Sequence, residues 1–506
     1  MQTSPPLPPT PPPRTATLHR GITLLGGLNA LILLSYTLLS WPMAAGHPDG
    51  AKQAAAQSAL ARAAGLDDQA VAFAGGRPFS SMTVFAATYG VHLVLLTITF
   101  LGLLLLLARH QDELSDATVT LLFRFSAAFA GICAFASPLI LDFWLSLAWG
   151  KMVALGRNPY YMPRTEDVLA GIPLDPGGTM TYGPLWATIS GALMAIAGGN
   201  PIIGFVLFRV LFAVAWLSLL WLARALLREH STWSQCAAIA VLGWMPVSLL
   251  RIYADGHNDI ALVAFIAGWL FLLQHGRYRL ATLVLTASVL VKYVSAPLLV
   301  LDALLAARRR EWRSYALTLG LAALFVAFAF APFLRSLEFF DAMTHGRDWR
   351  FWRPRDAVHG LQLLLGVRLP LLPGLVHVFF PALAAFCTAR LFTRPGNGEL
   401  WLAVIAVMGA VAFNAVGHLW PWYVLWLMLP AALIANGWWG RWVVGLALAL
   451  PFGMLCWDLT ADGDVRNRLV SLGMYGFSVF WATILARLFY PAARPAVAPL
   501  AAAGTR

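Results

Sequence analysis

Residues 281–306, ATLVLTASVLVKYVSAPLLVLDALLA, place a single lysine in the middle of a strongly apolar run. The chain has only three lysines against thirty-two arginines, and Lys292 is one of the three. A hydrated ammonium at membrane depth is costly unless a partner compensates it, so it marks a candidate functional site. The run is flanked by basic residues and is too short for two spans of about 20 residues each. We therefore expect two half-length helices meeting near Lys292, tolerated only where broken helices line a cavity or pack inside protein.

The composition is that of a polytopic, all-α membrane protein. Of 506 residues, 59% are hydrophobic and only 11% charged, against about 25% charged in soluble domains. The net charge of +12 would suggest nucleic acid in a soluble protein. Here the arginines lie mostly in short gaps between apolar runs, where they orient helices and meet anionic lipid headgroups. We therefore expect membrane lipids, and no nucleic acid, as partners. The four cysteines match no metal-ligand spacing and imply no disulfide framework.

Apolar runs long enough to cross a bilayer recur along the whole chain. Arg14 and Arg20 precede the first run and orient the N-terminus towards the cytoplasm. With the two half-length helices, the pattern predicts about 14 membrane segments and both termini in the cytoplasm. The predicted full spans are 21–41, 83–108, 119–141, 202–226, 234–251, 260–275, 314–333, 371–392, 399–416, 422–437, 441–458 and 469–488.

This organisation divides the chain into four parts. Residues 1–18 form a proline-rich tail that we expect to be disordered and cytoplasmic. Residues 19–115 hold two additional N-terminal membrane helices with an outward loop, and 116–490 form the main membrane domain. Residues 491–506 are a second cytoplasmic tail.

Most titratable residues near the membrane converge on the outer side in this topology. Asp142 ends the third predicted span, and the following stretch has the spacing of an amphipathic helix lying along the outer interface. The other candidates occur in the motifs NPYY, YGPL, GHND, VKY and HLWPWY and in a loop rich in arginine. They are Asn158, Tyr160, Tyr182, His257, Asn258, Asp259, Lys292, Tyr293, Arg350, His418 and Trp422.

The order of these motifs resembles that of the polyprenol-phosphate-sugar-dependent glycosyltransferases of the GT-C superfamily. It is most similar to the bacterial polyprenol-phosphomannose mannosyltransferases, over residues 119–490. Two features differ: the two additional helices, and the Phe-Trp pair after Asp142 where a second acidic residue would favour a metal site. The resemblance implies a hexosyltransferase of the cell envelope, in the bacterial cytoplasmic (inner) membrane, with its active site facing the periplasm or outside.

The implied reaction moves a monosaccharide, mannose by resemblance, from a polyprenyl-phosphate donor to a glycan or lipid acceptor. The acceptor hydroxyl needs a general base within hydrogen-bond reach, and Asp142 is the candidate. The leaving phosphate needs stabilisation of its charge rather than a proton donor. We assign that role to Lys292, helped by arginines of the loop 335–355 such as Arg350.

Each candidate also has a simpler explanation. Asp259 could cap the sixth span, and His257 with Asp259 could bind a divalent metal, the one cofactor that the sequence leaves open. His418 and Trp422 could belong to an interfacial aromatic belt, and the loop arginines could meet lipid headgroups. Lys292 could pair with Asp302 or Asp142 as a structural ion pair.

A membrane transporter or flippase for a lipid-linked or anionic substrate is the main competing function, because broken helices and midplane charges also occur in transporters. No internal repeat supplies a second interrupted segment to match 281–306. A non-catalytic envelope scaffold would explain the spans but not Lys292.

Overall fold

The computed structural model describes residues 13–44, 82–170, 172, 174, 176–335, 354–367, 370–415, 419–435, 437–459 and 464–489. Over these residues the protein is all-helical, with one isolated antiparallel bridge between Arg164 and Gly177 and no strand. The predicted fold class, an all-α polytopic membrane protein, is confirmed.

Nine helices of the described residues are long and apolar enough to cross a membrane, and the bent pair α10–η3 would make a tenth. The predicted total of about 14 segments is not confirmed, because α11 and η6–α19 are shorter than full spans. The helices are α1 (Pro13–Ala44), α4 (Met82–Arg109), η2 (Gln111–Glu113), α5 (Asp116–Cys133), α6 (Leu141–Ala154), α7 (Glu166–Leu169), α8 (Pro184–Ile196), α9 (Pro201–Leu226), α10 (Thr232–Gly243), η3 (Val247–Ala254), α11 (Asp259–Gln274), α12 (Tyr278–Val291), η4 (Tyr293–Ser295), α13 (Pro297–Arg308), α14 (Trp312–Phe330), α16 (Pro354–Leu365), α17 (Leu372–Thr393), α18 (Asn397–Ala410), η5 (Val411–Ala415), η6 (Pro421–Val424), α19 (Leu425–Leu433), α20 (Trp438–Leu459) and α21 (Asp464–Phe489).

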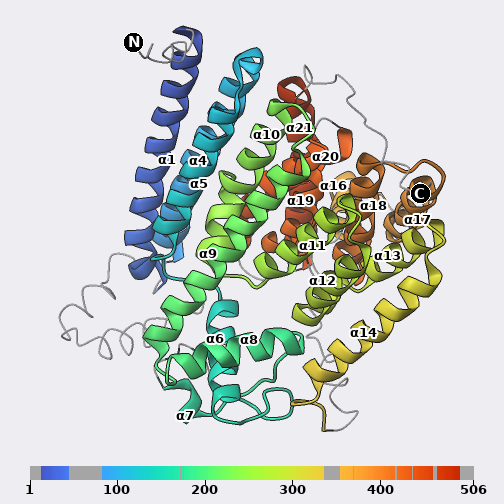
Figure 1. Ribbon diagram of the computed structural model, residues 1–506. Helices are drawn as coiled ribbons and strands as arrows, with labels where there is room; N and C mark the ends of the chain where they lie inside the picture. The colour runs from blue at the N-terminus through green and yellow to red at the C-terminus, as the bar shows by residue number, and fades with distance from the viewer. Residues whose placement is uncertain are drawn as a thin grey trace, which may run out of the picture.

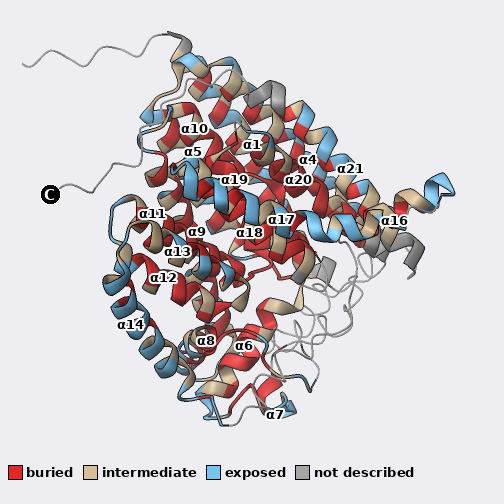
Figure 2. Cartoon of the chain, turned by 90° about the vertical axis from the view of Figure 1, so that its right-hand side faces the viewer, coloured by how far each residue is buried: buried red, intermediate tan, exposed pale blue. Residues whose placement is uncertain are grey.

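The long helices form the body of the molecule, and α6, α7 and α8 gather at one end of it (Figure 1). We call this the α6–α8 end. The additional N-terminal helices α1 and α4 pack against each other, and α1 also packs against α5. Buried residues fill the middle of the body (Figure 2). The outward side of α14 instead exposes apolar residues such as Leu317 and Phe328, which suits contact with lipid.

The predicted break at Lys292 is confirmed. Helix α12 ends at Val291, Lys292 has extended backbone angles (φ −154, ψ 123), and α13 begins at Pro297 after one turn of 3-10 helix. Proline suits the first helical turn because it has no N–H to satisfy there. The two half-length helices fold back on each other: Thr282 donates a hydrogen bond to Asp302 (2.6 Å), and the guanidinium of Arg309 lies 3.6 Å from the ring centre of Tyr278.

The predicted span 119–141 is wrong at its second half. Helix α5 ends at Cys133 and α6 begins at Leu141, so residues 134–140 form a separate linker. Pro138 explains part of this, because proline has no N–H for a helix hydrogen bond. Asp142 therefore lies in the first turn of α6 rather than at the end of a span.

Two further differences concern helix boundaries and burial. Helix α1 begins at Pro13, inside the tail predicted for residues 1–18. The amphipathic helix predicted after Asp142 is α6, but most of its side chains are buried. It packs so closely on α8 that a Cβ on Gly150 would lie 2.5 Å from the carbonyl oxygen of Ser190.

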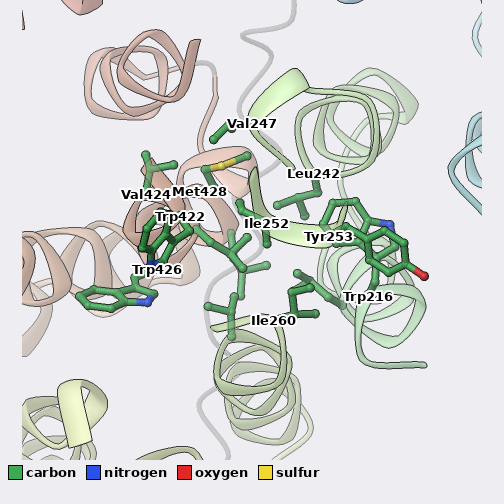
Figure 3. Close-up of a cluster of buried hydrophobic side chains, with 14 of the residues drawn as sticks. Trp216, Leu242, Val247, Ile252, Tyr253, Ile260, Trp422, Val424, Trp426 and Met428 are labelled. Atoms are coloured by element: carbon green, nitrogen blue, oxygen red, sulfur yellow. The ribbon is translucent and has the colours of Figure 1, made fainter. Parts of the chain in front are cut away.

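A buried cluster of large side chains supports the region where the candidate residues meet. Figure 3 shows Trp422 and Trp426, from η6 and α19, on one side of Ile252, with Tyr253 and Trp216 on the other. All five are buried. Close packing of this kind fixes side-chain positions, since few rotamers fit.

Candidate functional site

The candidate residues that the structure brings together come from the ends of separate helices. Asp142 lies in the first turn of α6, Asp259 begins α11, and His257 precedes α11 directly. Lys292 occupies the break between α12 and α13, and Trp422 lies in η6. A carboxylate in the first turn of a helix is favoured by the helix dipole, which suits both aspartates.

Asp142 and His257 form a hydrogen-bonded pair. The His257 Nδ1 lies 3.0 Å from Asp142 Oδ2. The His257 ring is stacked on Trp422, with centroids 4.1 Å apart and 16° between the planes. The side chain of His257 is completely buried, whereas that of Asp142 is 24% exposed. The carboxylate is therefore the member of the pair that an incoming substrate can reach.

The surroundings of Asp142 keep it ionised. Burial raises the pKa of this carboxyl group, but the hydrogen bond and charge of His257, the charge of Lys292 and a hydrogen bond from Tyr182 together bring the pKa below its ordinary value. At neutral pH Asp142 can therefore act as a proton acceptor but not as a proton donor.

Lys292 pairs with Asp259, not with Asp302 or Asp142. Its Nζ lies 2.9 Å and 3.0 Å from the two carboxylate oxygens of Asp259, which has no exposed side-chain surface. Trp426 Nε1 donates a further hydrogen bond to Asp259 Oδ1 at 2.5 Å. The two ion pairs considered for Lys292, with Asp302 or with Asp142, were thus wrong. Asp302 instead accepts hydrogen bonds from Trp269 and Thr282.

Aromatic rings surround the ammonium of Lys292. Its Nζ lies 4.8 Å from the ring centre of Tyr423, 5.4 Å from that of Trp426 and 5.6 Å from that of Tyr182. Ring faces stabilise a cation at such distances, most strongly where water is excluded. Two of its three N–H bonds suffice for Asp259, which leaves one for a ligand.

The YGPL motif connects the α6–α8 end to the break in the membrane helices. The side chain of Tyr182 is close enough to Asp142 to lower the pKa of that carboxyl group, and its carbonyl oxygen accepts a hydrogen bond from the hydroxyl of Tyr160 (2.9 Å). The next residue, Gly183, donates its N–H to the carbonyl of Val291 at 2.9 Å, directly before Lys292. The two charged pairs are thereby held in one assembly.

We expect Gly183→Ala to destabilise this junction. A Cβ at residue 183 would lie 2.0 Å from the carbonyl oxygen of Leu290, a backbone atom that cannot move away cheaply. Overpacking of this kind costs about 1–3 kcal/mol. Thermal unfolding in detergent should show a lowered Tm, whereas Gly131→Ala, where a Cβ meets no heavy atom within 4 Å, should unfold like the parent protein. Equal Tm values for the two variants would contradict the close contact.

Other predicted residues take supporting positions. The amide of Asn158 donates to the carbonyl of Phe333 (2.7 Å) and accepts from the N–H of Tyr160 (3.1 Å), so it is used inside the protein. The side chain of Asn258 and the hydroxyl of Tyr293 are buried and have no hydrogen-bond partner among the described residues. Arg350 and His418 lie outside the described residues.

The metal alternative finds no geometric support in the part of the chain that the structure describes. No group of three or more His, Cys, Asp or Glu side chains there could hold a metal ion. The carboxylates of Asp142 and Asp259 are instead engaged by His257 and Lys292.

Sequence reasoning missed two kinds of residue. Trp426 resembles an ordinary apolar residue of a membrane helix, and Tyr423, although part of the HLWPWY motif, was not among the candidates; they contact Asp259 and Lys292, respectively. Arg209 lies alone in the apolar run of α9, and that isolated charge was a signal that could have found it. Its side chain is buried, with 3% of its surface exposed, and it donates a hydrogen bond to Ala136 in the linker 134–140.

The fold defines a polytopic membrane protein, and a cluster of titratable side chains held at helix ends is typical of a membrane-embedded enzyme. The model of the MptA_B family, alpha-(1->6)-mannopyranosyltransferase, N-terminal domain, matches residues 51–308, just over half of the chain. The chain belongs to this family, which makes it a membrane mannosyltransferase and confirms the predicted relationship to the polyprenol-phosphate mannosyltransferases. No curated protein matches the chain.

Proposed function

We propose that this mannosyltransferase takes mannose from a polyprenyl-phosphate donor and transfers it to a hydroxyl group of a glycan or lipid acceptor, with Asp142 as general base. The observation that carries the proposal is the pairing of a partly exposed, ionised Asp142 with a buried His257. A base must be ionised and within reach of the hydroxyl that it deprotonates, and the lowered pKa and partial exposure of Asp142 support that role.

The reaction that fits this site is a direct displacement. Asp142 takes the proton of the acceptor hydroxyl while the acceptor oxygen bonds to C1 of mannose. The bond from C1 to the phosphate oxygen breaks, and its electron pair leaves with the lipid monophosphate. A double displacement needs a second carboxylate as nucleophile about 5–5.5 Å away. Asp259 is unsuited to that role because it is buried and bound by Lys292 and Trp426, so we propose inversion at C1.

Lys292 is proposed to contact the donor phosphate with its remaining N–H. A fixed cation in a site that excludes water stabilises the charge that develops on the leaving group. Arg350 and His418 are proposed as further contacts to the phosphate. Trp422 is proposed as a ring on which the sugar stacks.

The orientation of the site towards the outside of a bacterial cytoplasmic membrane is supported by the distribution of arginines. Helices α12 and α13 meet at Lys292, and their far ends carry Arg277, Arg279 and the run 308–310. Since basic residues favour the cytoplasmic side, we propose that the α6–α8 end faces the periplasm or outside.

The proposal is tested with purified protein in lipid vesicles supplied with polyprenyl-phosphate sugars of different identity. Mass spectrometry should detect a mannosylated acceptor and free lipid monophosphate with the mannose donor. The same assay with EDTA tests a metal requirement. Movement of a solute across the bilayer without any covalent product would instead favour the transporter alternative, and a nucleotide-sugar donor as the sole active substrate would exclude the lipid donor.

We expect His257→Phe to move the acid limb of the activity profile to higher pH. The variant keeps a ring against Trp422 but loses the hydrogen bond and charge of His257 that lower the pKa of Asp142. Burial, which raises this pKa, is then opposed only by Lys292 and Tyr182. Activity needs the ionised base and is lost as pH falls through its pKa, so the acid limb should move to higher pH. An unchanged limb in kcat/KM would show that His257 does not control the ionisation of the base.

A further inference from the structure

The linker at residues 134–140 joins α5 to α6 and ends immediately before the helix that carries Asp142. Most of its residues are buried. Buried peptide groups outside regular structure need hydrogen-bond partners, because an unpaired one costs free energy comparable to a lost hydrogen bond. The side chains that supply these partners therefore also fix where α6 begins.

One set of partners comes from the end of α1. Ser40 Oγ accepts the N–H of Ser137 at 2.8 Å, and the indole of Trp41 donates to the carbonyl of Phe135 at 2.9 Å. The hydroxyl of Thr37 donates to the carbonyl of Ile132, in the last turn of α5, at 3.3 Å. Helix α1 lies before residue 51, outside the part of the chain that the family model matches.

A second set of partners comes from the buried core. Arg209 donates to the carbonyl of Ala136 at 2.7 Å and to that of Tyr253 at 3.0 Å. Asp255 Oδ1 accepts the N–H of Leu139 at 2.9 Å, and its Oδ2 pairs with Arg251 at 3.4 Å. Both members of the Arg251–Asp255 pair have no exposed side-chain surface.

The additional helix α4 completes this second set. The guanidinium of Arg251 lies 4.2 Å from the ring centre of Tyr89 on α4. On the other side of the linker, the guanidinium of Arg209 lies 4.7 Å from the ring of Phe143, the neighbour of Asp142. Helix α1 thus bonds the linker directly, whereas α4 supports it through Arg251, the partner of Asp255.

We propose that helices α1 and α4 are a positioning part of the mannosyltransferase site, which hold the linker 134–140 from one side while Arg209 and Asp255 hold it from the other, so that Asp142 stays in register with His257. The inference rests on the proposed role of Asp142 as general base. Positioning matters because a displacement of a catalytic group by about 1 Å can cost about 100-fold in rate.

The test compares Ser40→Ala/Trp41→Phe with Ser35→Ala in the full-length protein. The double variant removes two hydrogen bonds to the linker, and Trp41→Phe keeps an aromatic ring at residue 41. The control removes the bond from Ser35 Oγ to His92 Nε2 (3.2 Å), which joins α1 to α4 without touching the linker. We expect kcat of the double variant to fall about 10- to 100-fold, with KM for the donor unchanged and the control close to the parent.

Two further readouts separate positioning from general loss of structure. The acid limb of the pH profile should move to higher pH in the double variant, as in His257→Phe, because Asp142 moves away from His257. Hydrogen exchange should accelerate in peptides covering 134–140 and not in those of α9. If the double variant does not fold, Thr37→Val, which removes one bond at the same junction, takes its place with the same readouts.

An unchanged kcat, or a loss equal to that of Ser35→Ala, overturns the inference. Assaying Asp142→Asn in parallel separates it from the proposed function. An inactive Asp142→Asn beside a fully active double variant overturns only the positioning role. Transfer by Asp142→Asn overturns the base assignment and the positioning role with it.

Discussion

Replacing Asp142 with asparagine should reduce mannosyl transfer by about 10²- to 10⁴-fold, the range that general bases contribute. Asparagine has nearly the same shape and its amide oxygen can still accept the hydrogen bond from His257. It cannot take a proton from the acceptor hydroxyl. The measurement is kcat in vesicles supplied with the lipid donor, together with the yield of folded protein, which should equal that of the parent.

The matched control for this variant is Asp167→Asn. Asp167 also lies at the α6–α8 end, but its side chain is 57% exposed and pairs with Arg157 on the surface. Exposed ion pairs contribute little, so neither stability nor transfer should change much. Equal activity of Asp142→Asn and Asp167→Asn would rule out Asp142 as the base.

Replacing Lys292 with methionine should both destabilise the protein and stop transfer. The variant leaves Asp259 as a buried, unpaired carboxylate, and breaking a buried ion pair in this way costs about 3–5 kcal/mol. Adding Asp259→Asn removes that charge while keeping an acceptor for the indole of Trp426. Thermal unfolding of the double variant should therefore recover much of the lost stability.

The double variant distinguishes a structural from a functional lysine. If Lys292 meets the donor phosphate, Lys292→Met/Asp259→Asn stays inactive although it is stable. Recovery of transfer together with stability would reduce Lys292 to a packing role. Lys151→Met is the control, because its ammonium lies on the surface of the α6–α8 end with one long contact, 3.4 Å, to the carbonyl of Ala170.

The sequence predicted the break at Lys292 because three local signals agreed: a charge in an apolar run, basic residues at both ends of that run and too few residues for two spans. It did not predict the partner of that lysine. Asp259 lies 33 residues away and reaches Lys292 only through the packing of α11 on α12. Pairing between side chains of two helices depends on how each helix is rotated about its axis and how deep it lies in the membrane. The sequence of an apolar helix with little periodicity does not reveal either quantity clearly.

The position of Asp142 shows a related difficulty. The apolar run continues from α5 through the linker, so the hydropathy pattern conceals the end of one helix and the start of the next. Buried aromatic residues such as Trp426 were missed because membrane belts and cores use the same residues. Arg209 was also missed, although a lone arginine in a span is a signal in its own right.

The folding back of α12 on α13 has a consequence for membrane topology. Because Arg309 lies against Tyr278, the two ends of this hairpin lie side by side, and we expect the chain to enter and leave it on the same face of the bilayer. The hairpin would then not move the chain across the membrane. The spans after it would alternate in direction as if the hairpin were absent. Reporter fusions ending at His275 and at Arg310 should accordingly report one and the same compartment.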